Sequence, residues 1–186
     1  MIRILAVIAA LVCVAPAVAQ PKLAAGLDPQ NTILLDTKYG RVVIKLRTDL
    51  APHHAERIKQ LSRDGFYNNV PFHRVIAGFM AQTGDGARGD GTGNSKYPNL
   101  KAEFTPTHFV RGVVGMARSQ NPDSGNSQFF IMFAPAPFLD GKYTVIGEVV
   151  SGMDAVDKIK KGPREQNGAV SDPDRILKMQ VAADAK

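Results

Sequence analysis

The chain carries, from residue 72 to residue 86, the run FHRVIAGFMAQTGDG. The run is mostly apolar, yet it contains the guanidinium of Arg74 and the neutral amide of Gln82. An arginine is costly in apolar surroundings unless it has a partner or a task. The run therefore predicts either a binding strand or an ordinary strand whose arginine reaches solvent or pairs with a carboxylate.

Extended geometry decides which side chains of this run share a face. Alternate residues of a strand point the same way, which places Arg74, Met80 and Gln82 together. Phe79 falls on the opposite face of the strand, and we expect a bulge at Gly78 to turn its side chain to the face of Arg74.

The residues before this run predict a hairpin followed by a helix. Two runs rich in apolar and β-branched residues, 32–36 and 41–47, are separated by a short turn that ends in Gly40. Residues 48–65 then change to helical spacing, with Asp49 as the expected N-terminal cap.

Two adjacent histidines, His53 and His54, fall on the expected helix. Neighbouring residues of a helix point to different faces, so this pair does not suit a single metal ion. We expect both side chains to face solvent.

A glycine-rich segment, residues 83–95, follows the central run. Its stretch GDGARG formally matches the dinucleotide-binding fingerprint, but more glycines follow where that motif requires a helix. Asp85, Asp90 and Asn94 suggest calcium ligands, yet their spacing is not that of a calcium loop and no glutamate closes it. The segment predicts a long surface loop beside the site.

The rest of the chain predicts several short strands and a second helix, after an irregular stretch over residues 96–108. In one strand Gln128, Phe130 and Met132 share a face and apolar residues fill the other, so both faces need cover. Strands are expected over residues 111–118, 127–134, 143–150 and 173–182, and the helix over residues 154–161.

Many short strands and two helices in one domain predict a mainly β, all-β fold. The expected architecture is a closed or nearly closed β structure capped by helices.

Residues 1–19 have the features of a cleavable signal peptide, with a basic start, an apolar core and a small-x-small site ending at Ala19. The apolar core is too short for a transmembrane anchor. Cleavage removes Cys13, the only cysteine, so the mature domain has no disulfide. We expect residues 20–30 to form a flexible leader, residues 31–186 to form one domain, and the protein to be periplasmic or secreted.

The net charge of +6 comes from basic residues that are scattered, apart from a short lysine cluster at residues 158–161. Nucleic-acid binding favours a basic stripe with interleaved aromatic residues, and the sequence has no such stripe. A mildly basic surface is expected, with no nucleic-acid partner and no membrane association after signal cleavage.

Four segments occur in order along the chain: FHRVIAGFMAQTGD, GMARS, SQFFI and FLDGKYTVIGEV. In this order and at these distances they resemble the cyclophilin family of peptidyl-prolyl isomerases. The resemblance covers residues 31–182. The signal sequence and the MAR form of the second segment are similar to exported bacterial members.

The resemblance implies a closed eight-stranded antiparallel β-barrel with a helix over each end. It implies an isomerase without cofactor or metal, expected as a monomer, that acts on proline-containing peptides and unfolded exported proteins. It implies these roles: Arg74 as the catalytic residue; Phe79, Met80, Phe130 and Leu139 around the proline ring; Gln82 and Gln128 steadying the substrate; the backbone of Ala117, Arg118 and Ser119 pairing with the peptide; and His73 nearby.

Two substrate-binding positions depart from the best-known eukaryotic pattern. Phe138 replaces a tryptophan and Tyr143 replaces a histidine. The lost indole N–H implies weaker binding of cyclosporin, while isomerisation does not depend on it. The turn between Ser119 and Ser127 is also one residue longer, so roles inside it transfer less directly.

Rotation about an X-Pro bond breaks no covalent bond, so its catalysis needs no nucleophile. The twisted imide nitrogen regains a lone pair, which a fixed guanidinium meets and a planar amide cannot. Two alternatives remain at this point. One is a proline-peptide binding chaperone without catalysis, and the other is a hydrolase using His73, Asp85 and Ser119, which no G-x-S-x-G motif supports.

Overall fold

The computed structural model describes residues 23–185, and the expected signal peptide lies outside them. The described chain forms strands, two α-helices and short 3₁₀ helices. The strands are β1 (Thr32–Thr37), β2 (Gly40–Leu46), β3 (Arg74–Ile76), β4 (Met80–Thr83), β5 (Val113–Met116), β6 (Phe129–Met132), β7 (Val145–Ser151) and β8 (Lys178–Val181); the α-helices are α1 (Pro52–Arg63) and α2 (Met153–Lys158); the 3₁₀ helices are η1 (Pro29–Asn31), η2 (Pro122–Ser124), η3 (Pro137–Leu139), η4 (Arg164–Gln166) and η5 (Ala182–Asp184).

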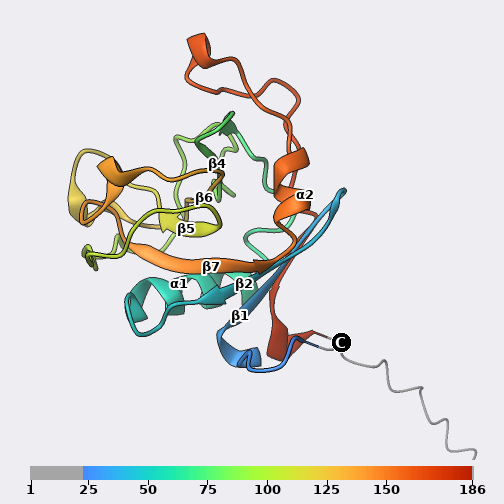
Figure 1. Cartoon of the computed structure of the whole chain (residues 1–186), viewed down its shortest axis with the longest axis vertical. Helices are drawn as coiled ribbons and strands as arrows, with labels where there is room; N and C mark the ends of the chain where they lie inside the picture. The colour runs from blue at the N-terminus through green and yellow to red at the C-terminus, as the bar shows by residue number, and fades with distance from the viewer. Residues whose placement is uncertain (1–22, 186) are drawn as a thin grey trace, which may run out of the picture.

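One antiparallel sheet contains all eight strands, in the order β3-β4-β6-β5-β7-β2-β1-β8. The sheet curls around the core as a half-barrel (Figure 1). Its edge strands, β3 and β8, do not pair with each other, so the prediction of a closed barrel is wrong.

The segment before β8 explains why the sheet stays open. It crosses the gap beside β3 through separate hydrogen bonds, such as that from the Phe72 N–H to the Asp174 C=O at 2.8 Å. Asn167 and Asp172 adopt left-handed backbone angles there, and Pro173 has no N–H to donate. A continuous ladder therefore cannot form along this segment.

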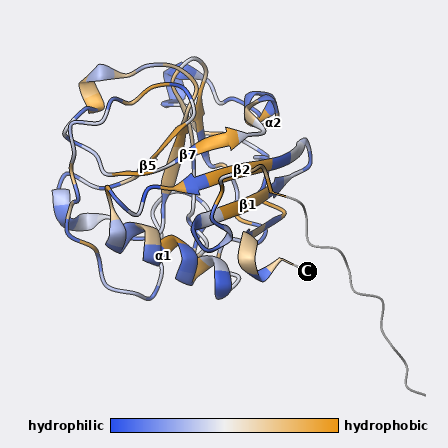
Figure 2. Ribbon diagram, turned by 60° about the horizontal axis from the view of Figure 1, so that its bottom comes forward, coloured by the Kyte–Doolittle hydropathy of each residue, from blue (hydrophilic) through white to orange (hydrophobic). Residues whose placement is uncertain are grey.

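The core lies inside the curl and is built from alternate residues of the strands, including Ile33, Val42 and Ile131, all fully buried. In Figure 2 the orange, apolar colour concentrates on the strands, while the outer turns of α1 are blue. The helix α1 packs against β8 and β7, and α2 packs against β2. Both helices thus cover the core with one apolar side.

The start of α1 differs from the prediction. The helix begins after Ala51, which makes no side-chain cap, and the carboxylate of Asp49 instead accepts hydrogen bonds from Arg47. The capping acceptor is Glu103, whose two carboxylate oxygens accept the N–H groups of His53 and His54 at 3.2 and 3.0 Å. A residue fifty positions away in the chain therefore caps this helix.

His54 is the second correction in α1. Its ring is 1 % exposed, and its Nδ1 lies 2.6 Å from a Glu103 oxygen, whereas His53 is exposed as expected. Burial lowers the pKa of His54, and the nearby carboxylate opposes that shift. The neutral ring therefore donates its Nδ1–H to Glu103.

The central run forms a hairpin of β3 and β4 rather than one strand with a bulge. Gly78 has a φ of +71° and lies in the turn, which the Phe79 N–H closes by donating to the Ile76 C=O at 3.0 Å. The glycine supplies a left-handed conformation that other residues rarely adopt. Arg74 and Gln82 consequently lie directly opposite each other on the two strands.

The chain before β1 is fastened to the domain from Leu23 onward. Leu23 packs against a small buried cluster formed by Leu34, Ala182 and Ala185. Asp28 caps η1 by accepting from the Gln30 N–H at 2.9 Å. The last residues of the expected leader are therefore in contact with the sheet. Within residues 23–185, the search for a helix with the length and apolarity of a membrane span finds none.

A second apolar layer covers the outer face of β4, β6 and β5. It contains Met80, Phe109, Phe130 and Met132, with Leu139 from η3 packed on them. Both faces of β6 are thus covered, as its alternating sequence predicts. The candidate site lies where this outer layer opens to solvent.

Candidate active site

Strand register builds one side of the site from residues that are far apart in sequence. Arg74 pairs with Gln82 across β3 and β4, Gln82 pairs with Phe130 across β4 and β6, and Phe130 pairs with Gly115 across β6 and β5. Directly opposite residues of antiparallel strands point to the same face. A cation, an amide and an aromatic ring therefore form one row, and a side chain at Gly115 would collide with the ring of Phe130.

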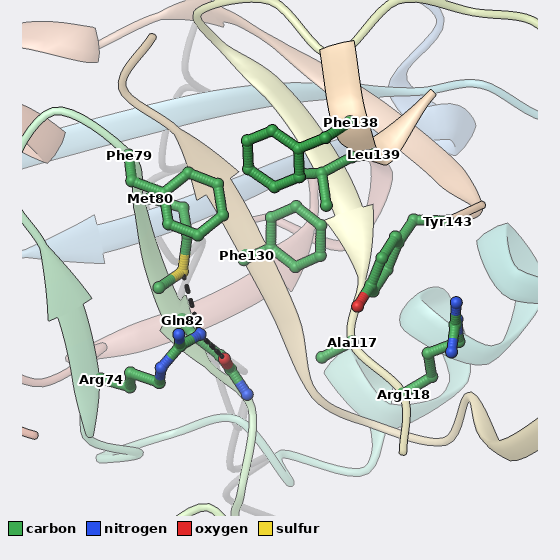
Figure 3. A pocket seen from close by; sticks show the side chains of 10 residues that line it. All are labelled: Arg74, Phe79, Met80, Gln82, Ala117, Arg118, Phe130, Phe138, Leu139 and Tyr143. Carbon is green, nitrogen blue, oxygen red and sulfur yellow. Dashed lines mark hydrogen bonds between the residues drawn. The ribbon is translucent and has the colours of Figure 1, made fainter. Parts of the chain in front are cut away.

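A groove of about 210 Å³ opens above this row. Figure 3 shows the ring of Phe130 between Arg74 and Gln82 on one side and Tyr143 on the other, with Phe79, Phe138 and Leu139 above it. The lining residues are Arg74, Phe79, Met80, Gln82, Ala117, Arg118, Phe130, Phe138, Leu139 and Tyr143. All ten belong to the set that the sequence resemblance implies.

The guanidinium of Arg74 is fixed by uncharged acceptors. Its Nε donates to the Asn167 C=O at 3.0 Å, one terminal nitrogen to the Asn167 Oδ1 at 2.9 Å, and the other to the Gln82 Oε1 at 3.2 Å. Burial lowers the pKa of Arg74, but a guanidinium remains charged in neutral water. The terminal nitrogen that bonds to Gln82 also donates to the Met80 sulfur at 3.9 Å, and the cation borders an apolar groove.

The amide of Gln82 continues into a chain of hydrogen bonds. Its Nε2 donates to the Gln128 Oε1 at 3.0 Å, and the Gln128 Nε2 donates to the carbonyl groups of Gly91 and Gly93 at 3.0 and 2.8 Å. Gln82 is therefore oriented from both ends, because the same amide accepts from Arg74 and donates to Gln128.

The glycine-rich loop that carries these carbonyls is organised by a buried carboxylate. Asp85 accepts the N–H groups of Ala87, Arg88, Gly91 and Gly93 at 2.9 to 3.2 Å. Burial alone would raise the pKa of Asp85, but these backbone donors outweigh it and lower the pKa to about 2. The segment is a surface loop, as predicted, with an ionised residue at its centre.

Aromatic contacts shape the opposite wall. The Tyr143 ring meets the Phe130 ring edge-on with centroids 5.8 Å apart, and Phe109 stacks behind Phe130 at 5.9 Å. The Arg118 guanidinium lies 4.4 Å from the centre of the Tyr143 ring and donates to the Lys142 C=O at 2.9 and 3.1 Å. Arg118 thus fastens the end of β5 to the turn before β7.

Three residues that the resemblance implies lie outside the groove. Ser119 and Gln128 line an adjoining polar groove of about 310 Å³, which shares Gln82, Ala117 and Arg118 with the first. His73 lies apart from both grooves: its ring lies against Gly91 and borders a separate cavity. Successive side chains at a strand alternate in direction, so His73 points away from the face that Arg74 occupies.

The backbone from residue 117 to residue 119 is partly engaged within the protein. The Ala117 N–H donates to the Gln128 C=O at 2.9 Å, and the Ser119 N–H donates to the Ser124 Oγ at 2.8 Å. Within residues 23–185 the Arg118 N–H has no hydrogen-bonded acceptor.

The hydrolase arrangement does not form. Neither ring nitrogen of His73 has a hydrogen-bond partner within the described chain, and the Ser119 Oγ bonds to Ser124 instead. Burial lowers the pKa of His73, so the ring is neutral at pH 7. A base without a bonded nucleophile or orienting carboxylate cannot work as a triad.

Asn167 and Asp85 are the site residues whose roles the sequence analysis missed. The pair Asn167-Gly168 is a turn signal, and Asn167 does adopt a left-handed conformation with a φ of 53°. That signal predicts a turn but not that the turn reaches Arg74. Asp85 within a run of glycines predicts a loop but not four converging N–H groups.

Comparison with known proteins places this geometry in a family. Residues 32–181 match the model of the cyclophilin type peptidyl-prolyl cis-trans isomerases. A probable peptidyl-prolyl cis-trans isomerase of Brucella suis biovar 1 (strain 1330) is 57 % identical over 189 residues, which cover 96 % of each chain.

Solved structures agree with the fold. A cyclophilin from Hirschia baltica superposes with a TM-score of 0.75 at 27 % identity, covering 86 % of this chain and 77 % of that one. A cyclophilin type peptidyl-prolyl cis-trans isomerase from Cryptosporidium parvum, crystallised in the presence of the dipeptide Ala-Pro, gives 0.73 at 26 % identity, covering 81 % and 98 %. The chain belongs to the cyclophilin type peptidyl-prolyl cis-trans isomerases, a class of enzymes.

Proposed function

We propose that this protein catalyses rotation about X-Pro peptide bonds in exported proteins during their folding, with Arg74 stabilising the twisted imide. The proline ring lies on Phe130 in the groove, between Met80 and Leu139. The Arg118 N–H pairs with the peptide backbone beside it.

The chemistry requires only differential binding. Amide resonance sets a barrier of about 18–20 kcal/mol and uncatalysed times of about 10 to 100 s. In the twisted state the proline nitrogen is pyramidal and carries a lone pair, so a guanidinium N–H donates to it there and not in either planar state. Reaching milliseconds takes about 10⁴-fold, or roughly 5.5 kcal/mol, which suits one preorganised charged donor in a partly dry groove.

One observation carries the proposal: the Arg74 guanidinium borders an apolar groove and is positioned by neutral acceptors, with N–H groups to spare. A binding module needs the apolar groove but has no use for a cation beside the imide nitrogen. The arrangement therefore favours an isomerase over a chaperone that only binds proline peptides.

The test is cis/trans exchange of a short Ala-Pro peptide, measured by NMR with and without protein. We expect catalysed exchange with the wild type and a loss of at least 100-fold in Arg74→Ala, while the peptide affinity changes by less than 10-fold, because the apolar contacts persist. Wild-type turnover in Arg74→Ala rejects the mechanism. Peptide binding without catalysed exchange in the wild type favours the chaperone.

Export is the second part of the proposal, and it is supported by the signal features of residues 1–19. Fractionation of cells that express the full chain tests it. We expect a mature protein that begins at Gln20 in the periplasm or the medium. A full-length product that stays in the cytoplasm refutes this part and leaves the catalytic part unaffected.

A further inference from the structure

One residue, Asn167, supplies two of the three oxygen acceptors that fix Arg74. Its backbone C=O takes the Nε–H at 3.0 Å and its side-chain Oδ1 takes a terminal N–H at 2.9 Å. We propose that Asn167 is a positioning residue for isomerisation, in which these two neutral oxygens replace a carboxylate and orient the Arg74 guanidinium without neutralising it. This inference rests on the proposed role of Arg74.

Two other arginines, Arg41 and Arg47, show what this replacement changes. Arg41 presents the same edge, its Nε and one terminal nitrogen, to the two oxygens of Asp36 at 2.6 and 2.9 Å. Arg47 does the same with Asp49 at 2.9 and 2.7 Å. Both are ion pairs in which the charge of the guanidinium is compensated. Asn167 reproduces this two-point geometry with oxygens that carry no net charge.

The charge of Arg74 is consequently available to the groove. Among the described residues no carboxylate lies within ion-pair distance of its guanidinium, and its other partners, Gln82 and Met80, are also neutral. A nearby anion would draw the guanidinium toward itself and weaken the field at the remaining N–H groups. Neutral acceptors fix the planar fork and leave that field in place.

The fold holds Asn167 in the conformation that this contact requires. The residue ends η4 with a φ of 53° and a ψ of 28°, left-handed angles that asparagine tolerates better than other non-glycine residues. The loop is tied to the β3 hairpin at three points: the Val75 N–H donates to the Gly168 C=O, the Gly162 N–H donates to the Val75 C=O, and the Arg164 side chain donates to the Ala77 C=O, at 2.8, 2.9 and 3.1 Å.

Two substitutions separate the parts of the proposal. Asn167→Gly keeps the left-handed backbone and the C=O but removes Oδ1, so we expect kcat to fall roughly 3- to 10-fold with little change in KM. Asn167→Asp keeps both oxygens but adds a negative charge. In that variant the guanidinium stays in place, and we expect kcat to fall at least as far because its charge is compensated.

The spectroscopic readout is the resonance of the terminal N–H groups of Arg74 in the protein without peptide, assigned by its disappearance in Arg74→Ala. We expect faster exchange of these protons with water in Asn167→Gly, which loses the Oδ1 acceptor, and slow exchange in Asn167→Asp. The matched controls are Asn69→Gly and Asn69→Asp, because Asn69 is also exposed and left-handed, with a φ of 62°, and its C=O accepts from Arg175. We expect both controls to keep wild-type kcat and an unchanged resonance.

Wild-type kcat and an unaltered Arg74 resonance in Asn167→Gly overturn the positioning role. Wild-type kcat in Asn167→Asp overturns the requirement for neutral acceptors. If kcat falls equally in the Asn167 variants and in the Asn69 controls, the Asn167 contact only stabilises its loop, and the proposal is also overturned. Full activity in Arg74→Ala refutes the proposed mechanism instead, and the exchange of the terminal N–H groups of Arg74 still reports whether Asn167 orients the guanidinium.

Discussion

Phe138 is 63 % exposed at the rim of the groove, and the centre of its ring lies 5.6 Å from that of Phe79. A ring in this place adds apolar surface for a peptide but offers no hydrogen-bond donor. Catalysis in our proposal depends on Arg74, which lies on the other side of Phe130 (Figure 3). Changes at Phe138 should therefore alter ligand binding more than rate.

We predict that Phe138→Trp tightens cyclosporin binding by roughly 3- to 10-fold, the value of one added hydrogen bond from the indole N–H. The kcat for the Ala-Pro peptide should change by less than 2-fold. Titration calorimetry and NMR exchange measure the two quantities. Phe138→Tyr is the control, since it enlarges the ring without placing an indole donor. Equal affinity in both variants and in the wild type refutes the prediction.

At the scale of elements, buried carboxylates organise the segments that have little regular structure of their own. Asp85 gathers the N–H groups of the glycine-rich loop, and Glu103 joins the irregular segment before β5 to the start of α1. Each uses one side chain to satisfy several backbone donors that no strand or helix satisfies. The order of these two segments thus depends on the ionised carboxylates of Asp85 and Glu103.

The loop contact predicts a specific loss of stability in acid. The folded pKa of Asp85, about 2, lies below its ordinary value of 3.8. The ionised form therefore adds stability above pH 4, about 2 kcal/mol, which is lost as the pH falls toward 2. Urea unfolding of Asp85→Asn should show this loss already at pH 7 and a weaker dependence on pH, whereas Asp172→Asn, at a fully exposed side chain, should resemble the wild type. An unchanged pH dependence in Asp85→Asn contradicts the assignment.

The helix contact predicts that Glu103→Gln destabilises the fold by roughly 1–2 kcal/mol, because an amide accepts at one atom only and brings no charge to the positive end of α1. The measurement is the free energy of unfolding in urea at pH 7. Glu56→Gln, an exposed change in the same helix, is the control and should cost less than about 0.5 kcal/mol. Equal costs in both variants would mean that Glu103 does not act as a cap.

At the scale of the whole molecule, the curled sheet brings together two strands and a loop that are far apart in the sequence. Arg74 comes from β3, Phe130 from β6 and Asn167 from the loop before β8. The open edge between β3 and β8 is where this last loop approaches Arg74. The incomplete closure of the barrel is thus part of how the site is assembled.

The catalysed rate of isomerisation should not vary with pH near neutrality. Arg74 keeps its charge, and burial lowers the pKa of His73, which lies outside the groove. We predict a flat kcat/KM between about pH 6 and 9 for a protein that sediments as a monomer, measured by NMR exchange and analytical ultracentrifugation. A change of more than 3-fold across this range would require a titrating group in the site.

Much of the site was accessible from the sequence because it depends on local order. Alternation predicts that Arg74, Met80 and Gln82 share a face, and the pairing of β3, β4 and β6 then places Arg74, Gln82 and Phe130 in one row, although the hairpin at Gly78 was expected as a bulge in one strand. The resemblance of four segments supplied the remaining lining residues. The expected helix cap at Asp49, the solvent-facing His54 and the closed barrel were wrong, since each depended on contacts with distant segments.

The sequence by itself determined the mainly β class and the order of most strands and both helices, because periodicity and turn residues act over short distances along the chain. The residues around the groove came from the resemblance of four segments to a known family. Only the tertiary structure decided that Glu103 caps α1, that four N–H groups converge on Asp85, and that Asn167 accepts two hydrogen bonds from Arg74 across the open edge of the sheet. Hydrogen bonds between segments far apart in the chain depend on where the whole backbone leads each donor and acceptor, and no local pattern records that.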